Sequence, residues 1–208
     1  IDFLLQDDDV ESTTQAHIGT AETTLTKADL KNLYFELDGF TLSDSKIKLI
    51  QKKKSVDSGK PDPAFGLLLK NADITCTQLI FSTPELALDA NLVKTKLNQL
   101  QLSSANDLLA IQAQGIQIEK SDVAYRDPEA VSTPGHLNAG DLDLSDLNAN
   151  LPDFSFQKDT LFVSADALSG NDKSGLKLHS LQASIRVTPG SIEIKNALAS
   201  LNQTSLNG

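Results

Sequence analysis

The chain has 208 residues, of which 39% are hydrophobic and 5% aromatic, and its 18 basic and 28 acidic residues give a net charge of −10. This composition excludes a disordered chain and predicts one domain with a core of Leu, Ile, Val and Ala. The acidic balance argues against a nucleic-acid partner, because such proteins present basic surfaces. We therefore expect residues 1–208 to form a single β-repeat domain.

The start of the chain carries no signal for a metal or a membrane. Because it begins at Ile1 rather than Met, we expect it to be an excised piece of a longer protein. The run Asp7-Asp8-Asp9 lacks the Asp, Gly and Glu spacing of a calcium loop and is interpreted as an exposed acidic turn. No apolar run in the chain approaches the roughly 20 residues of a membrane span.

An eight-residue pattern then occurs in four windows. Each window has large apolar residues at its third and eighth places, Ala or Ser at its sixth place, and polar residues at its fourth and fifth places. The windows are Thr23–Leu30 (TTLTKADL), Phe40–Ile47 (FTLSDSKI), Leu67–Ile74 (LLLKNADI) and Ile116–Val123 (IQIEKSDV). A looser copy, LQLSSANDL, starts at Leu100. Repeated units of this kind predict strands that stack on their neighbours.

The repeat reverses the phase of the apolar alternation at its centre. Leu42 and Ile47 have opposite parity, so a flat strand would send their side chains to opposite faces. A two-residue hairpin loop at Asp44-Ser45, Asn71-Ala72 or Lys120-Ser121 would bring them back to one face, and so would a bulge or a bent β-arc. None of these loops contains the glycine that tight hairpin turns favour, so both geometries stay open. Either one places the apolar side chains of a unit on one inner surface.

Period-two alternation outside the windows predicts further half-buried strands. It is clearest at Leu86, Leu88 and Ala90; Leu100 and Leu102; Leu142 and Leu144; Leu176 and Leu178; and Ile192 and Ile194. Turn-forming residues recur between strands at Asp38-Gly39, Pro61 to Pro63, Thr83-Pro84, Gly115, Asp127-Pro128, Thr133 to Gly135, Pro152-Asp153, Gly170-Asn171, Ser174-Gly175 and Pro189-Gly190. This spacing predicts consecutive antiparallel strands or solenoid rungs. A helix over Ala90–Leu102 is the alternative for that segment.

The predicted fold is all-β: an elongated, curled antiparallel sheet or a β-taco or solenoid-like repeat, with a β-sandwich as the alternative. Its inner apolar surface is the candidate functional element. The interior is either a dry core, stabilised by about 25 cal/mol per Å² of buried apolar area, or an open surface that receives acyl chains or a β-strand. The candidate lining residues are Leu25, Leu30, Phe40, Leu42, Ile47, Leu67, Leu69, Ile74, Ile116, Ile118 and Val123.

The polar residues predict no catalytic, cofactor or metal site. His17, His136 and His179 lie in separate segments without partners at metal-ligand spacing. Cys76 is predicted to be a small buried hydrophobe, and Asp141 and Asp143 to be solvated charges on the outer face of a strand. Lys52-Lys53-Lys54 and the following Ser55 to Pro63 are interpreted as a solvated loop. We expect a protein that is not an enzyme.

Two stretches of the chain resemble the TamB-like branch of the AsmA-like proteins, especially the long forms of Bacteroidota. The first is the run from Gly66 to Asp127, with LLLKNADITCTQLIFSTP, LNQLQLSS and GIQIEKSDVAYRDPE. The second runs from Gly140 to the end, with the motifs LDLSDLNA, FSFQKDT, KSGLKL and IEIKN in that order. The resemblance covers the chain from about Ile18 onward, and it rests on the order of the motifs.

This resemblance implies a long periplasmic protein that is anchored in the inner membrane by a segment outside this chain and is involved in outer-membrane biogenesis. The implied fold is a β-taco, and the implied partners are phospholipid acyl chains or strands of outer-membrane proteins. The implied roles are lipid transport and protein translocation, with no catalytic residue. The eleven lining residues would then face the groove.

Two other functions fit the same pattern of strands. A structural β-solenoid or sandwich would space or dock other proteins, including nascent strands paired at its open edges. A β-helical enzyme acting on carbohydrate fits the strand spacing, but the chain lacks clustered aromatic residues and a set of acidic and basic residues suited to catalysis.

Overall fold

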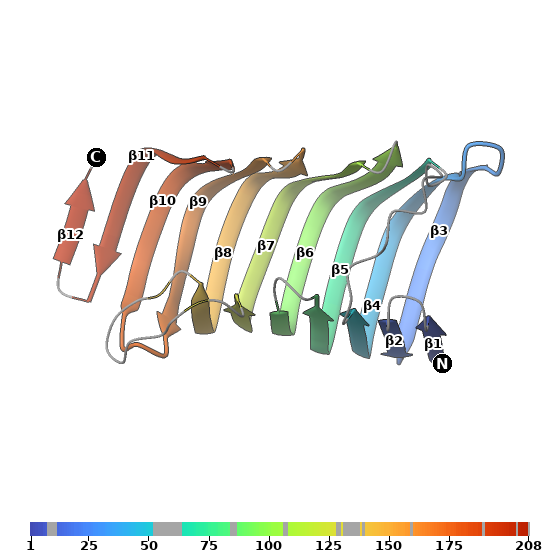
Figure 1. Ribbon diagram of the computed structural model, residues 1–208, viewed down its shortest axis with the longest axis horizontal. Coiled ribbons are helices and arrows are strands. Elements are labelled where there is room, and N and C mark those ends of the chain that lie inside the picture. Colours follow the sequence, from blue (N-terminus) through green and yellow to red (C-terminus); the bar gives the residue numbers. More distant parts are fainter. Residues whose placement is uncertain are drawn as a thin grey trace.

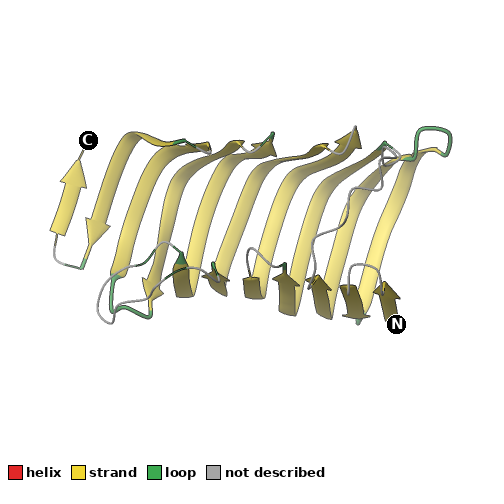
Figure 2. Cartoon of the chain, in the orientation of Figure 1, coloured by secondary structure: helices red, strands yellow, loops and turns green. Residues whose placement is uncertain are grey.

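The structure is a computed structural model that describes residues 1–7, 12–51, 64–83, 87–105, 108–127, 130, 138, 140–158, 160–188, 190–202 and 204–207. This part of the chain is all-β and contains no helix. Its twelve strands form one open, curled sheet rather than two packed sheets (Figures 1 and 2). The prediction of an elongated curled sheet is confirmed, and the β-sandwich alternative is wrong for the described residues.

The strands follow one another across the sheet almost in chain order. They are β1 (Asp2–Asp7), β2 (Ser12–His17), β3 (Thr20–Asp29), β4 (Tyr34–Gln51), β5 (Phe65–Ser82), β6 (Ala87–Ala105), β7 (Leu108–Arg126), β8 (Asp141–Gln157), β9 (Thr160–Asp172), β10 (Lys177–Thr188), β11 (Ser191–Leu201) and β12 (Thr204–Asn207). All pairs are antiparallel except β4 and β5, which are parallel. Both β2 and β3 pair with β4, on successive halves of its length.

Each of the long strands β4 to β8 bends sharply at two corners. At a corner, two successive residues face outward, and the apolar alternation resumes beyond them on the same side as before. The register aligns one set of these residues as the upper corner line: Asp38-Gly39, Lys70-Asn71, Asn98-Gln99, Gln114-Gly115 and Pro152-Asp153. The lower corner line is stepped, because register shifts displace some of its members along neighbouring strands. It comprises Ser43-Asp44, Thr77-Gln78, Val93-Lys94, Glu119-Lys120 and Ser145-Asp146.

Left-handed backbone conformations produce many of these corners. Gly39, Asn71 and Gly115 on the upper line have φ values of 62°, 51° and 62°, and Asp44 and Lys120 on the lower line have values of 50° and 48°. A positive φ angle turns the chain so that the next side chain returns to the side it would otherwise leave. The strands continue through these positions, so the bend that the repeat predicted is found and the hairpin alternative is wrong.

Small side chains occupy the inside of the bends. Ser45 and Ser121, at the sixth place of their windows, are 0% exposed, although no second layer covers the sheet. The Ser121 hydroxyl donates to the Glu119 carbonyl at 3.1 Å and accepts a hydrogen bond from the Val93 N–H at 3.2 Å. Backbone groups close to the bend therefore have hydrogen-bond partners. The apolar face is the concave side of each bend, because the buried residues lie on that face.

Several local expectations are corrected by the structure. Ala90–Leu102 is part of strand β6 and not a helix, since its side chains alternate between the two faces. The turn signals at Asp38-Gly39, Gly115 and Pro152-Asp153 lie inside strands, where they form corners. The window Thr23–Leu30 contains a register shift between Leu25 and Lys27 but no left-handed residue, and β3 ends at Asp29, so that Leu30 lies in the turn before β4. Residues 8–9, 52–63 and 131–137 lie outside the described part of the chain, so the predictions for Lys52 to Pro63 and His136 stay untested.

Candidate functional site

The apolar face consists of rows of side chains that run across the whole sheet. Directly paired residues on neighbouring strands share a face, so the register defines each row. The Leu69 row is Leu25, Leu37, Leu69, Leu100, Ala113, Phe154, Val163, Ile185 and Ile194. The Ile118 row is Ala21, Leu42, Ile74, Thr95, Ile118, Ala149, Leu168, Leu181 and Ala199. The Val123 row is Ala16, Ile47, Leu79, Ala90, Val123 and Leu144, and it ends at Asp172.

Most of the lining residues predicted from the sequence lie together on this face. Phe40, Leu42, Ile47, Leu67, Leu69, Ile74, Ile116, Ile118 and Val123 do so, and each is buried or half-buried. Leu25 belongs to the Leu69 row but lies on the edge strand β3 and is 56% exposed. The prediction that Leu30 lines this face is wrong. It lies in the turn after β3, 76% exposed and outside the rows, because the strand ends at Asp29, one residue before it.

The apolar face is half-open along its length. The described sheet has a single layer, so its apolar side chains touch their neighbours sideways and no other strand packs on top of them. Full burial is confined to residues beside the corners, and the largest side chains below 2% exposure are Cys76, Ser45 and Ser121. The closed dry core that the sequence left open is absent from the described residues. The apolar area that remains exposed is available to a ligand or a partner.

One buried polar atom of the apolar face lacks a hydrogen-bond partner among the described residues. The Thr95 side chain is 7% exposed and lies between Ile74 and Ile118 in the Ile118 row. Its Oγ1 atom has no hydrogen-bond partner. A buried hydroxyl without a partner costs free energy, so Thr95 destabilises this part of the face.

Ion pairs join neighbouring strands on the opposite, polar face. Lys94 contacts Glu119 at 2.6 Å, and Lys96 contacts Asp73 at 3.5 Å, each across a pair of neighbouring strands. The hydrogen bond from Lys94 holds the pKa of the Glu119 carboxyl below its usual value. These exposed pairs contribute little stability but keep one face of the sheet polar.

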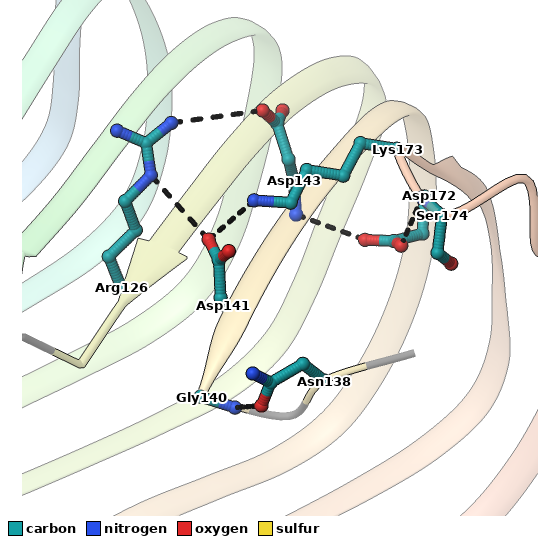
Figure 3. A network of polar contacts seen from close by, with 8 residues as sticks. All are labelled: Arg126, Asn138, Gly140, Asp141, Asp143, Asp172, Lys173 and Ser174. Atoms are coloured by element: carbon teal, nitrogen blue, oxygen red, sulfur yellow. Dashed lines mark hydrogen bonds and ion pairs between the residues drawn. The ribbon is translucent and has the colours of Figure 1, made fainter. Parts of the chain in front are cut away.

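A denser polar network closes one end of strands β7 to β10 (Figure 3). Asp141 forms ion pairs with Arg126, at 3.6 Å, and with Lys173. Arg126 also forms an ion pair with Asp143, at 4.0 Å. Asp172 is 8% exposed and accepts the N–H groups of Asp143 at 3.0 Å and Ser174 at 2.8 Å. Burial opposes ionisation of Asp172, but these hydrogen bonds outweigh it and lower the pKa of the carboxyl. The network fixes the turn between β9 and β10.

The remaining candidate residues lie far apart and have structural roles. His17 contacts Asp2 at 2.6 Å on β1, and His179 Nε2 lies 3.0 Å from the Asn202 carbonyl near the other end of the sheet. Cys76 is 1% exposed, and its Sγ lies 3.3 Å from the Ser45 carbonyl at a corner, so its prediction as a small buried residue is confirmed. Among the described residues, no group of three or more His, Cys, Asp or Glu side chains is placed to hold a metal ion.

The eleven predicted residues represent only part of the face. Leu37, Leu100, Phe154, Val163 and Ile185 extend the Leu69 row, although none belongs to a predicted window that was assigned to the groove. A usable signal exists in the sequence. In strands β4 to β8, two successive polar residues between apolar alternations mark most of the corners. In the other corners, one of the two polar residues is replaced by Val93, Pro152 or a glycine.

The geometry defines the class of this protein as an open, curled, single-sheet β protein with one apolar and one polar face. Comparison with models of protein families, with curated proteins and with solved structures gives no match. Within the described residues, no helix is present that is long and apolar enough to cross a membrane. The function must therefore be argued from the two faces.

Proposed function

We propose that this chain is a noncatalytic segment of a periplasm-spanning envelope protein and that its apolar face holds phospholipid acyl chains. The observation that carries this proposal is the continuous apolar face, whose rows cross the sheet on the concave side of two corner lines and which no other described strand covers. An acyl chain lying along the rows would bury part of the remaining apolar area, at about 25 cal/mol per Å².

The resemblance to the TamB-like proteins supports the same proposal from a different direction. It implies passage of lipid between the inner and outer membranes, with the anchor in parts of the protein outside this chain. An open sheet suits that role, because a lipid can move from one strand to the next without crossing a polar barrier. In the Ile118 row, Thr95 is the one hydroxyl-bearing member, so the path stays almost wholly apolar.

Neighbouring residues on opposite faces provide a matched test. A photoreactive phenylalanine analogue at Ile118, half-buried on the apolar face, should crosslink to phospholipid when the protein is purified from a Gram-negative cell, and the same analogue at the exposed, polar-face Gln117 should not. In parallel, Ile118→Asp should reduce the phospholipid that copurifies, measured by mass spectrometry, and Gln117→Asp should leave it unchanged. A protein that carries no lipid, or equal crosslinking from both positions, would sink the proposal.

The open edges of the sheet support a second function, the docking of a β-strand from an outer-membrane protein. Among the described residues, β3 pairs with β4 alone, so the backbone groups along its other edge are free to accept a strand. Proline substitutions along β3 should abolish such docking, measured as crosslinking to a client strand, without changing the lipid that copurifies.

A further inference from the structure

A hollow of about 400 Å³ lies on the polar face, next to the lower corner line at the N-terminal end of the sheet. Two neighbouring rows of paired residues meet there. One row places Lys46 between His17 and Gln78, and the other places Lys48 beside Gln15, with Leu4 beyond it on β1. The lining residues are Asp2, Leu4, Gln15, Ala16, His17, Lys46, Ile47, Lys48 and Gln78.

Two lysines that have no carboxylate partner among the described residues line this hollow. Lys46 and Lys48 make no ion pair within the described part of the chain, whereas Lys94 and Lys96, with the same spacing on β6, are both paired with carboxylates. The one carboxylate that lines the hollow, Asp2, is bonded to His17 at 2.6 Å. Two free ammonium groups therefore face one hollow in a protein whose net charge is −10.

Neutral hydrogen-bond donors line this hollow, and apolar side chains line a neighbouring one. The amides of Gln15 and Gln78 line the hollow beside the two lysines and can donate hydrogen bonds. Lys48 also lines a second hollow of about 330 Å³, which contains the half-buried Ile50 and Ile80 and is also lined by Asp89 and Arg126. An anionic group held by the lysines would thus have an apolar surface within reach on the same face.

We propose that Lys46 and Lys48 bind the phosphate group of a phosphate ester that carries an apolar substituent, with Gln15 and Gln78 as additional donors and with Ile50 and Ile80 in contact with the substituent. Ammonium groups bind phosphate as point charges, and adjacent amides add directed hydrogen bonds. This site lies on the face opposite to the one proposed for acyl chains, so its failure and the failure of the lipid proposal are separable.

The test uses the purified chain and three ligands. Glycerol 3-phosphate and hexyl phosphate are titrated while the backbone amide resonances of residues 15–17, 46–48 and 78 are followed by NMR. Binding to vesicles of phosphatidylglycerol, with phosphatidylcholine as the neutral reference, is measured by sedimentation. We expect saturable shifts at these residues, with tighter binding of hexyl phosphate than of glycerol 3-phosphate because the hexyl chain buries apolar area.

Two double variants separate the site from net charge. Lys46→Gln with Lys48→Gln should weaken hexyl phosphate binding by about tenfold or more, since two charge-assisted hydrogen bonds are lost. Lys94→Gln with Lys96→Gln removes the same charge from the same face and should bind as the unaltered protein does. Circular dichroism of both variants confirms that the sheet is retained.

The ligands distinguish the source of the phosphate. Binding of hexyl phosphate that depends on Lys46 and Lys48 supports a soluble phosphate ester, and binding confined to phosphatidylglycerol vesicles with the same dependence supports a lipid headgroup. No saturable binding to any of the three, or an equal loss in both double variants, would overturn the proposal.

Discussion

At the scale of single residues, the small and polar side chains at the corners carry the most structural information. Ser45, Ser121 and Cys76 are the most deeply buried side chains, and each one has a hydrogen-bond partner in the backbone near a bend. At the end of strand β9, the charged side chain of Asp172 also binds backbone groups. Its two carboxylate oxygens accept hydrogen bonds from N–H groups of β8 and of the turn between β9 and β10. The fold therefore depends on polar groups that satisfy a bent backbone as well as on apolar contact.

Asp172→Asn should lower the free energy of unfolding by about 1–3 kcal/mol at neutral pH, because an amide leaves one of the two buried N–H groups without an acceptor. The folded-state pKa of Asp172 is lowered, so the carboxylate stabilises the fold fully above its unfolded pKa of about 3.9. This contribution is lost as the pH falls through the folded pKa.

The difference in stability between the unaltered protein and Asp172→Asn should accordingly narrow below pH ~4, measured by urea unfolding at a series of pH values. Asp166→Asn, at an exposed position of the same strand, is the control and should change little at any pH. A gap that stays constant into the acidic range would contradict the assigned role of the Asp172 carboxylate.

At the scale of the elements, the corners decide how each strand presents its side chains. Most strand residues alternate between faces, but every long strand from β4 to β8 contains two pairs of successive outward-facing residues. At several corners, a residue other than glycine has a left-handed backbone conformation, as at Asn71 and Lys120. Such conformations are costly for residues with a Cβ atom. The apolar packing on the inside of the bend offsets this cost.

Lys120→Gly should raise the free energy of unfolding by about 1 kcal/mol, because glycine adopts a positive φ angle without steric strain. The matched control is Gln117→Gly on the same strand, where φ is not positive and glycine should lower stability by roughly 0.5–1 kcal/mol. Urea unfolding of both variants measures the difference. If both substitutions were equally destabilising, the backbone at Lys120 would not be left-handed in solution.

At the scale of the whole molecule, the sheet is a one-dimensional array. Among the described residues, each strand contacts only the strands it pairs with. The longest ladders join β5, β6, β7 and β8, whereas β1 and β12 have one short ladder each. In such an array stability is the sum of local strand pairings, so unfolding begins at the ends.

Hydrogen exchange measured by mass spectrometry should therefore show the slowest exchange in β6 and β7 and the fastest in β1 and β12, with a gradual change between them. The free energy of opening should rise toward the centre, because a central strand must break two long ladders to expose its amides. Uniform protection from β1 to β12 would mean that the sheet unfolds as one cooperative unit.

The sequence by itself determined the all-β class, the one-sided apolar alternation and the reversal of its phase, because these features depend on residues close together in the chain. The windows around Asp44, Asn71 and Lys120 identified three true corners, but Leu30 was misplaced, because strand β3 ends at Asp29, one residue before it. The second corner of β6, at Asn98-Gln99, is marked by two successive polar residues but lies outside the predicted windows.

Only the tertiary structure decided that the corners align into two lines and that the apolar face stays open. Alignment depends on the register between strands, which is set by backbone hydrogen bonds between distant residues, and a single-residue slip would reverse the faces. Whether an apolar face is covered depends on what packs against it, and the alternation of one strand is the same in a sandwich and in an open sheet. In this protein the strands turn the apolar face inward at two lines of bends and leave it uncovered within the described residues.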